Sequence, residues 1–198
     1  EGDCTTVAPT NPVALGLRES IRCGVTTLGE IAQPGWPIET VAASPLNLTV
    51  FQELIAPTAE RVTGALELAR LHLRNSRGLT APGMCWRPGL SPHAPYSVHS
   101  ELLAAVIAMS VAERVPVAMH LAESREELEL LRHNAGPLRV LLEELGAWDA
   151  TAIRTERRPM EYLRLLAAAH RALVIHGNCL DDEEIAFLGM NAARITAV

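Results

Sequence analysis

Short apolar segments alternate with segments of helical periodicity along the chain. Val115 to Met119 is a charge-free run rich in β-branched side chains, which predicts a strand buried on both faces of a parallel sheet. The next segment, Arg125 to about His133, is predicted as a helix, with Ser124 as its N-cap and Glu127 as the other half of a capping box. Residues 120–123 therefore lie in a strand-to-helix connection, which is where α/β folds place their active sites.

The same alternation extends over the rest of the chain. Strands are predicted over residues 24–28, 46–51, 84–90, 171–176 and 195–198, and helices over residues 12–22, 57–75, 97–114, 138–145 and 159–170, with another helix starting near residue 181. A loop is predicted over residues 30–37, which are rich in proline and glycine. About five strand-then-helix units without a hairpin turn indicate a parallel α/β fold. Because a complete (β/α)8 barrel usually takes about 250 residues, the pattern predicts an open portion of a TIM barrel.

Composition and charge exclude several classes of partner. The chain has 17 Lys plus Arg against 23 Asp plus Glu, a formal net charge of -6, and its basic residues are scattered, so we expect no nucleic-acid partner. The longest apolar run, Leu102 to Met109, is less than half of a membrane span, so we expect no membrane partner and a soluble, cytoplasmic protein. The four cysteines show no CxxC spacing and are predicted to be reduced thiols.

Three of the seven histidines share one position in the predicted fold. His93, His120 and His176 each stand at the carboxyl end of a predicted strand, and all such ends face the same way in a parallel sheet. We therefore expect these three side chains to meet at one edge. The other four histidines fall inside predicted helices or at their ends, where structural or surface roles are expected.

Imidazoles and a carboxylate at one edge suit hydrolytic chemistry. Neutral imidazole binds zinc or iron(II), and a bound ion lowers the pKa of its water from about 16 toward about 7. A carboxylate beside that water can take its proton and pass it to a leaving group, and Glu123 is placed for this task. Two structural alternatives stay open: Glu123 as a first-turn acid that favours the helix dipole, and His176 as a histidine hydrogen-bonded to backbone.

Four segments resemble the motifs of a known family, the amidohydrolase superfamily, and in particular its deaminase and chlorohydrolase branch. Ser91–Tyr96, Met119–Glu123 and Val174–Asn178 are similar in sequence and order to the motifs after barrel strands four, five and six, and Gly24–Thr27 is similar to the second-strand motif. The resemblance covers nearly the whole chain.

The resemblance implies a role for each residue at the predicted edge. His120 is implied as a metal ligand and Glu123 as the proton shuttle, while His176 hydrogen-bonds the attacking water or the leaving group and His93 contacts the substrate. The implied cofactor is one divalent metal ion, zinc first and iron(II) as the alternative. The implied reaction is removal of an amino or chloro substituent from a heterocycle, so the expected partner is a small-molecule substrate, with purine nucleoside-like compounds among the candidates.

The chain departs from the family pattern at its metal ligands. The His-x-His pair after the first strand and the Asp after the eighth do not occur in the sequence. We therefore expect one incomplete barrel domain over residues 1–198, an internal piece running from strand two to about strand seven that is inactive alone. Its two exposed sheet edges predict homo-oligomers. The alternative function is a non-catalytic degenerate or truncated barrel that acts as a binding or assembly module.

Overall fold

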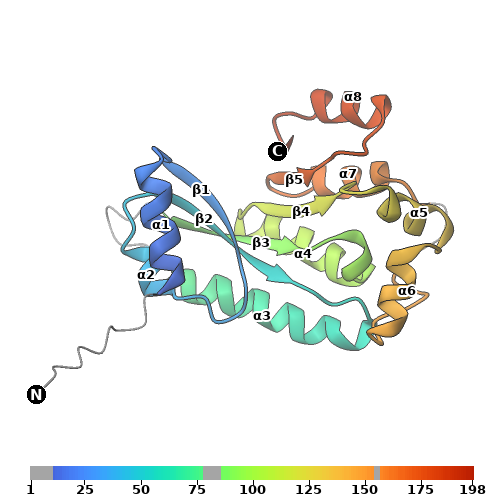
Figure 1. The fold of residues 1–198 in the computed structure, drawn as a ribbon, viewed down its shortest axis with the longest axis horizontal. Coiled ribbons are helices and arrows are strands. Elements are labelled where there is room, and N and C mark those ends of the chain that lie inside the picture. The colour runs from blue at the N-terminus through green and yellow to red at the C-terminus, as the bar shows by residue number, and fades with distance from the viewer. Residues whose placement is uncertain (1–10, 78–85, 154–156) are drawn as a thin grey trace, which may run out of the picture.

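The protein is described here by a computed structural model that covers residues 11–77, 86–153 and 157–198. Across these ranges, parallel strands follow one another in chain order through a single curved sheet, a half-barrel with helices between the strands (Figure 1). The strands are β1 (Thr27–Ala32), β2 (Asn47–Leu54), β3 (Trp86–Pro92), β4 (Val117–Leu121), β5 (Ala172–His176) and β6 (Ile195–Ala197). The predicted open portion of a parallel (β/α)8 barrel is therefore confirmed.

The helices lie between the strands and cover the outer face of the sheet. They are α1 (Pro12–Arg22), α2 (Ile38–Ala42), α3 (Ala59–Arg77), α4 (Ser100–Glu113), α5 (Arg125–His133), α6 (Pro137–Glu144), α7 (Pro159–Ala167) and α8 (Asp182–Met190), with the 3-10 turn η1 (Pro95–Ser97) before α4. Helix α4 contacts α3, α7, β3 and β4. Its buried face consists of Leu102, Leu103, Val106, Ile107 and Ser110.

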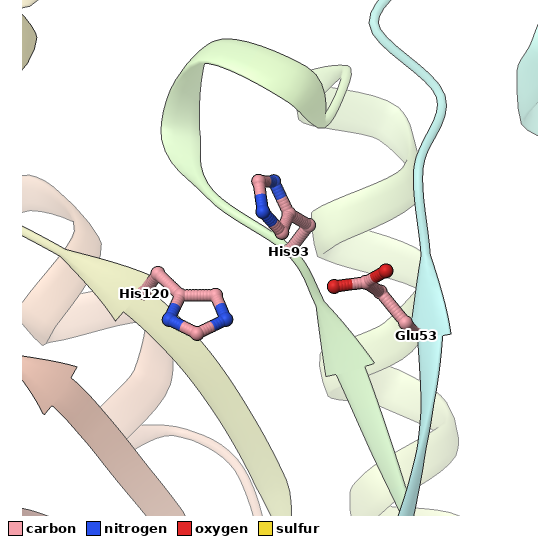
Figure 2. A group of neighbouring side chains, drawn as sticks. All are labelled: Glu53, His93 and His120. Carbon is pink, nitrogen blue, oxygen red and sulfur yellow. The ribbon is translucent and has the colours of Figure 1, made fainter. Parts of the chain in front are cut away.

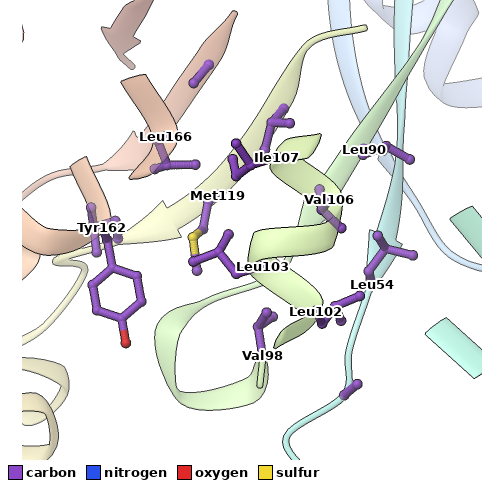
Figure 3. Close-up of a cluster of buried hydrophobic side chains, with 14 of the residues drawn as sticks. Leu54, Leu90, Val98, Leu102, Leu103, Val106, Ile107, Met119, Tyr162 and Leu166 are labelled. Carbon is purple, nitrogen blue, oxygen red and sulfur yellow. The ribbon is translucent and has the colours of Figure 1, made fainter. Parts of the chain in front are cut away.

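The main hydrophobic core lies between the outer face of the sheet and helices α3, α4 and α7 (Figure 3). Leu90 of β3 and Met119 of β4 are fully buried there against Leu102, Leu103 and other residues of α4. Each such side chain contributes about 1.5–3 kcal/mol by leaving water. A second, smaller cluster lies under α1 and α2 and consists of Leu17, Ala32, Val41, Leu46, Leu48, Val50 and Trp86.

The strands differ from their predicted limits, and β4 runs from Val117 to Leu121, which places His120 inside the strand and not in the connection predicted over residues 120–123. Strand β1 begins at Thr27 and runs to Ala32, so the predicted strand at 24–28 is too early and the predicted loop at 30–37 is wrong in its first three residues. Strand β2 continues three residues beyond the predicted end at residue 51. The reason is pairing: the parallel ladder joins Thr27 to Asn47 and goes on to Ala32 and Gln52, which carries both strands into polar residues. Residues 84 and 85 of the predicted third strand lie outside the described residues.

The inner face of the sheet carries an aromatic ring between two glycines. A Cβ atom added to Gly29 would lie 3.5 Å from Phe51 Cε2, and one added to Gly89 would lie 2.7 Å from Phe51 Cε1. Phe51 is 2% exposed although it faces the hollow side of the half-barrel. Gly89 therefore leaves the space that the Phe51 ring occupies.

Replacing Gly89 by alanine should destabilise the fold. We expect Gly89→Ala to lower the free energy of unfolding by about 1–3 kcal/mol, because the new methyl group displaces the Phe51 ring. Gly64→Ala, in the exposed part of α3 with nothing near the added Cβ, is the matched control and should raise that free energy by up to about 1 kcal/mol. Urea denaturation of the three proteins measures both, and equal midpoints for the two variants would contradict the packing argument.

The edge strands of the sheet and the lengths of the helices indicate which kinds of partner the chain could have. Strands β1 and β6 each pair with one neighbour within the described ranges, which leaves two edges of the kind that promote association between chains. Homo-oligomers remain a prediction. None of the helices in the described part of the chain has both the length and the apolar character needed to cross a bilayer.

Candidate active site

Main-chain hydrogen bonds join the carboxyl ends of the central strands. The amide of His93 donates to the Leu54 carbonyl at 3.1 Å, and the amide of His120 donates to the His93 carbonyl at 2.8 Å. On the next strand, the amide of Gly177 donates to the Leu121 carbonyl at 2.9 Å. These bonds continue the parallel pairing to the last residues of each strand, so the ends of β2, β3, β4 and β5 stay in register.

This register brings the four sequence-predicted site residues together. The ring centroids of His93 and His120 are 5.1 Å apart, and those of His120 and His176 are also 5.1 Å apart, with the latter two rings stacked at 27°. His120 Nδ1 lies 3.2 Å from His176 Nε2. Glu123 Oε1 lies 3.6 Å from the same His176 nitrogen. The three imidazoles thus form a row with the Glu123 carboxylate at one end.

The loops that carry these side chains hold unusual backbone conformations. Ala122 has a φ of 54° and His176 a φ of 77°, both in the left-handed region that disfavours residues with a Cβ atom. Such conformations cost about 1–3 kcal/mol each and cluster at functional sites. In β5, the positive φ at the last strand residue turns the chain toward Gly177, whose amide bonds to β4.

The tautomer of His93 follows from its partner. Ser97 Oγ lies 2.6 Å from His93 Nδ1 and 3.2 Å from the Ala94 carbonyl oxygen. The Ser97 hydroxyl can donate to that carbonyl and then accept the proton of Nδ1, an arrangement that leaves His93 Nε2 with the lone pair that binds a metal ion or accepts a hydrogen bond.

Glu53 is a site residue that the sequence reasoning missed. It lies near the end of β2, is 9% exposed, and accepts a hydrogen bond from the Gln33 side-chain amide. One donor atom from each of Glu53, His93 and His120 lies within 4.8 Å of the other two (Figure 2). The sequence gives little indication that Glu53 belongs to the site, because the apolar run that predicts β2 ends two residues before it.

The donor set of this cluster fits a divalent metal ion. Two imidazoles and one carboxylate form one of the common protein ligand sets of catalytic zinc, whose donors at about 2.0–2.2 Å lie roughly 3.5 Å apart in a tetrahedron. The three side chains would close by roughly 1 Å to reach that arrangement. A hydrogen bond between His93 and Ser97 and one from Gln33 to Glu53 already orient two of the three side chains.

Burial favours the neutral form of His120. Loss of hydration lowers the pKa of His120, and the neighbouring His93 and His176 rings lower it further, while Glu123 and Glu53 act in the opposite direction. Neutral imidazole is the form that coordinates metal ions.

Glu127 does not complete the predicted capping box. Its amide donates to Ser124 Oγ at 3.3 Å, as expected for an N-cap, but its carboxylate accepts from the amides of Ala122 and Glu123 at 2.9 and 3.0 Å. The left-handed turn at Ala122 points both amides toward α5, which makes them the nearer partners. Burial raises the pKa of Glu127, and the two amide hydrogen bonds lower it.

Two curated proteins are similar to the chain in sequence. It is 33% identical to the aminodeoxyfutalosine deaminase of Deinococcus radiodurans over 121 residues, covering 59% of this chain and 28% of that protein. It is 27% identical to a 5-methylthioadenosine/S-adenosylhomocysteine deaminase of Bacillus cereus over 188 residues, covering 91% of this chain and 38% of that protein. The chain thus spans 28% and 38% of the lengths of these relatives. The sequence matches no protein-family model.

Solved structures support the fold. The aminofutalosine deaminase of Helicobacter pylori in complex with methylthio-coformycin has a TM-score of 0.77 and 20% identity, covering 93% of this chain and 43% of that chain. An adenosine deaminase from Xanthomonas campestris with bound zinc has a TM-score of 0.52 and 20% identity, covering 93% of this chain and 45% of that chain.

Proposed function

We propose that this chain belongs to the amidohydrolase superfamily, and that it contributes catalytic residues to a metal-dependent hydrolase that removes an amino group from a heterocycle or nucleoside-like substrate. The observation that carries this proposal is the row of three imidazoles ending at the Glu123 carboxylate. A structural reading of the same residues accounts for each one singly. It does not account for their meeting at one edge of the sheet, where parallel α/β barrels carry their chemistry.

His120 is the proposed metal ligand, and the Glu53 carboxylate lies close enough to join it, while the neighbouring His93 imidazole is proposed to contact the substrate. A divalent ion held there would supply a water molecule whose pKa is lowered toward about 7. Zinc is the first candidate, because the donor set suits it and because a solved structure of this fold holds zinc; iron(II) is the alternative.

Glu123 is the proposed proton shuttle and His176 its partner. The Glu123 side chain is 47% exposed and lies 3.6 Å from His176, so its carboxylate is free to exchange a proton with a water molecule or a leaving group bound beside the imidazole row. His176 Nε2 lies between His120 Nδ1 and Glu123 Oε1. A hydrogen bond from His176 can therefore orient the attacking water or the leaving group while Glu123 moves the proton.

The substrate class follows from the relatives. Both curated relatives are named as deaminases of compounds with a nucleoside part, and the Helicobacter pylori structure carries methylthio-coformycin. We propose a small nucleoside-like molecule with an exocyclic amino group as substrate, and a cytoplasmic setting as predicted from the sequence. The non-catalytic binding or assembly module remains the rival function.

The decisive experiment measures metal content and deamination with the full-length gene product. Ammonia release should be followed with a panel of aminopurine nucleosides and their 5′-thio derivatives, before and after removal of the metal with a chelator and its replacement with zinc. We expect about one ion per chain, activity on at least one nucleoside, and loss and recovery of activity with the ion. A metal-free protein that is inert toward the whole panel would favour the binding module.

His93→Ala should separate substrate contact from metal binding. We expect KM to rise about tenfold or more while the zinc content stays near that of the wild type, because the proposed role of His93 is to hydrogen-bond the substrate through Nε2. His133→Ala, at the exposed end of α5, is the matched control and should change neither quantity. Loss of zinc from His93→Ala would instead make His93 a metal ligand together with Glu53.

A further inference from the structure

The loop between β4 and α5 is held at both of its central peptide units. The amides of Ala122 and Glu123 donate to the two oxygens of Glu127 at 2.9 and 3.0 Å. On the other side, the Ala122 carbonyl accepts from the Cys179 amide at 2.9 Å and the Glu123 carbonyl accepts from Asn178 Nδ2 at 3.2 Å. The main chain that carries Glu123 is therefore fixed from α5 and from the β5–α8 connection together.

Glu127 is the side chain of α5 that holds this loop. It is 1% exposed and lies at the third position of α5, where the positive end of the helix dipole favours a buried carboxylate. Each of its oxygens serves one amide, so neither amide of the loop is left without an acceptor. The left-handed conformation of Ala122 is unfavourable by itself and persists because such contacts determine it.

We propose that Glu127 is a positioning residue that holds the His120–Glu123 loop in the conformation that keeps the Glu123 carboxylate beside His176. The Glu123 side chain is half exposed, and its 3.6 Å contact with His176 alone does not fix a flexible glutamate. The direction of the side chain depends on the backbone, and Glu127 holds that backbone from the α5 side. This inference rests on the proposed function for its effect on the rate, and on the hydrogen bonds alone for its effect on the loop.

Glu127→Gln is the sharpest test of the inference. Glutamine keeps the shape of the side chain but offers one acceptor oxygen, and its amide group would face a backbone N–H that also donates. In the zinc-loaded full-length gene product we expect kcat to fall about tenfold or more with KM and zinc content within twofold of the wild type. The amide protons of Ala122 and Glu123 should lose protection from hydrogen exchange.

Two variants separate positioning from helix stability. Ser124→Ala removes the hydroxyl that caps the Glu127 amide but leaves both loop amides bonded, so it should lower stability with kcat within twofold of the wild type. Glu126→Gln makes the same chemical change at the neighbouring exposed position and should change neither kcat nor loop exchange. If Glu127→Gln fails to fold, Glu127→Asp keeps both oxygens on a shorter side chain, and the same split between kcat and KM is expected at smaller size.

The outcomes distinguish this inference from the proposed function. A wild-type protein without deaminase activity would overturn the function, while the exchange of the two loop amides would still decide the inference. An active wild type together with unchanged kcat and unchanged amide protection in Glu127→Gln would overturn the inference alone. Equal losses of kcat in Ser124→Ala and Glu127→Gln would reduce Glu127 to a residue that stabilises the helix.

Discussion

Glu123→Gln in the full-length gene product is expected to lower kcat by about 10²-fold or more and to leave the metal content unchanged. Glutamine fills the same space beside His176 but cannot accept and release a proton, so the variant removes only the shuttle. KM should change little, because the proposed substrate contact is His93 and not Glu123. Steady-state kinetics together with metal analysis of the purified protein measure the three quantities.

Glu126→Gln is the control for this prediction. It lies in the first turn of α5 and is exposed, so the same loss of a carboxylate there should affect only stability, by about 0.3–1 kcal/mol through the helix dipole. If Glu123→Gln turned over substrate at the wild-type rate, Glu123 would be an ordinary first-turn acid and the proton shuttle would have to be another residue.

His120→Ala is expected to remove the metal as well as the activity. Catalytic zinc is usually held by about three protein ligands, so losing one imidazole weakens binding, and the activated water is lost with the ion. Activity should therefore fall below that of Glu123→Gln. The row of rings would also be interrupted, because His120 lies between His93 and His176 with centroid distances of 5.1 Å on both sides.

Metal analysis after dialysis is the direct readout for His120→Ala. His133→Ala, which removes an exposed imidazole from the end of α5, should keep its ion and its activity. Addition of excess zinc to His120→Ala tests whether binding is weakened or abolished. Full zinc content in the variant at a low free-metal concentration would show that His120 is not a ligand.

The strand-end histidines were predictable because two signals coincide in the sequence. An apolar run that ends in a histidine marks β4 and β5, while His93 follows a less regular segment that contains Pro88 and Gly89. The parallel arrangement then brings all three histidines to one edge. Local residue types determine these features. The half-barrel and the place of these residues in it therefore follow from the sequence, while the roles of the residues remain predictions.

Glu53 and Glu127 were harder to predict, because pairing and turn geometry decide their places. Glu53 belongs to β2 through its register with Ser91 of β3, and no property of the residues around it signals that the strand continues so far. Glu127 stands at the right spacing from Ser124 for a capping box, yet the left-handed turn at Ala122 offers it two other amides. Sequence patterns of a few residues predict neither the extension of β2 to Glu53 nor the hydrogen bonds of Glu127 to the Ala122 and Glu123 amides.

The hydrogen bonds between the strand ends hold the histidines in place independently of the loops, so the loops can change in evolution while the strand ends do not. The imidazoles are fixed by main-chain bonds from Leu54 to His93, from His93 to His120 and from Leu121 to Gly177, which depend little on the identity of surrounding side chains. Insertions and deletions in the connections beyond these bonds can accumulate without displacing the histidines. A lineage can thus vary the lengths and sequences of its loops while the three histidines keep their places at the edge of the sheet.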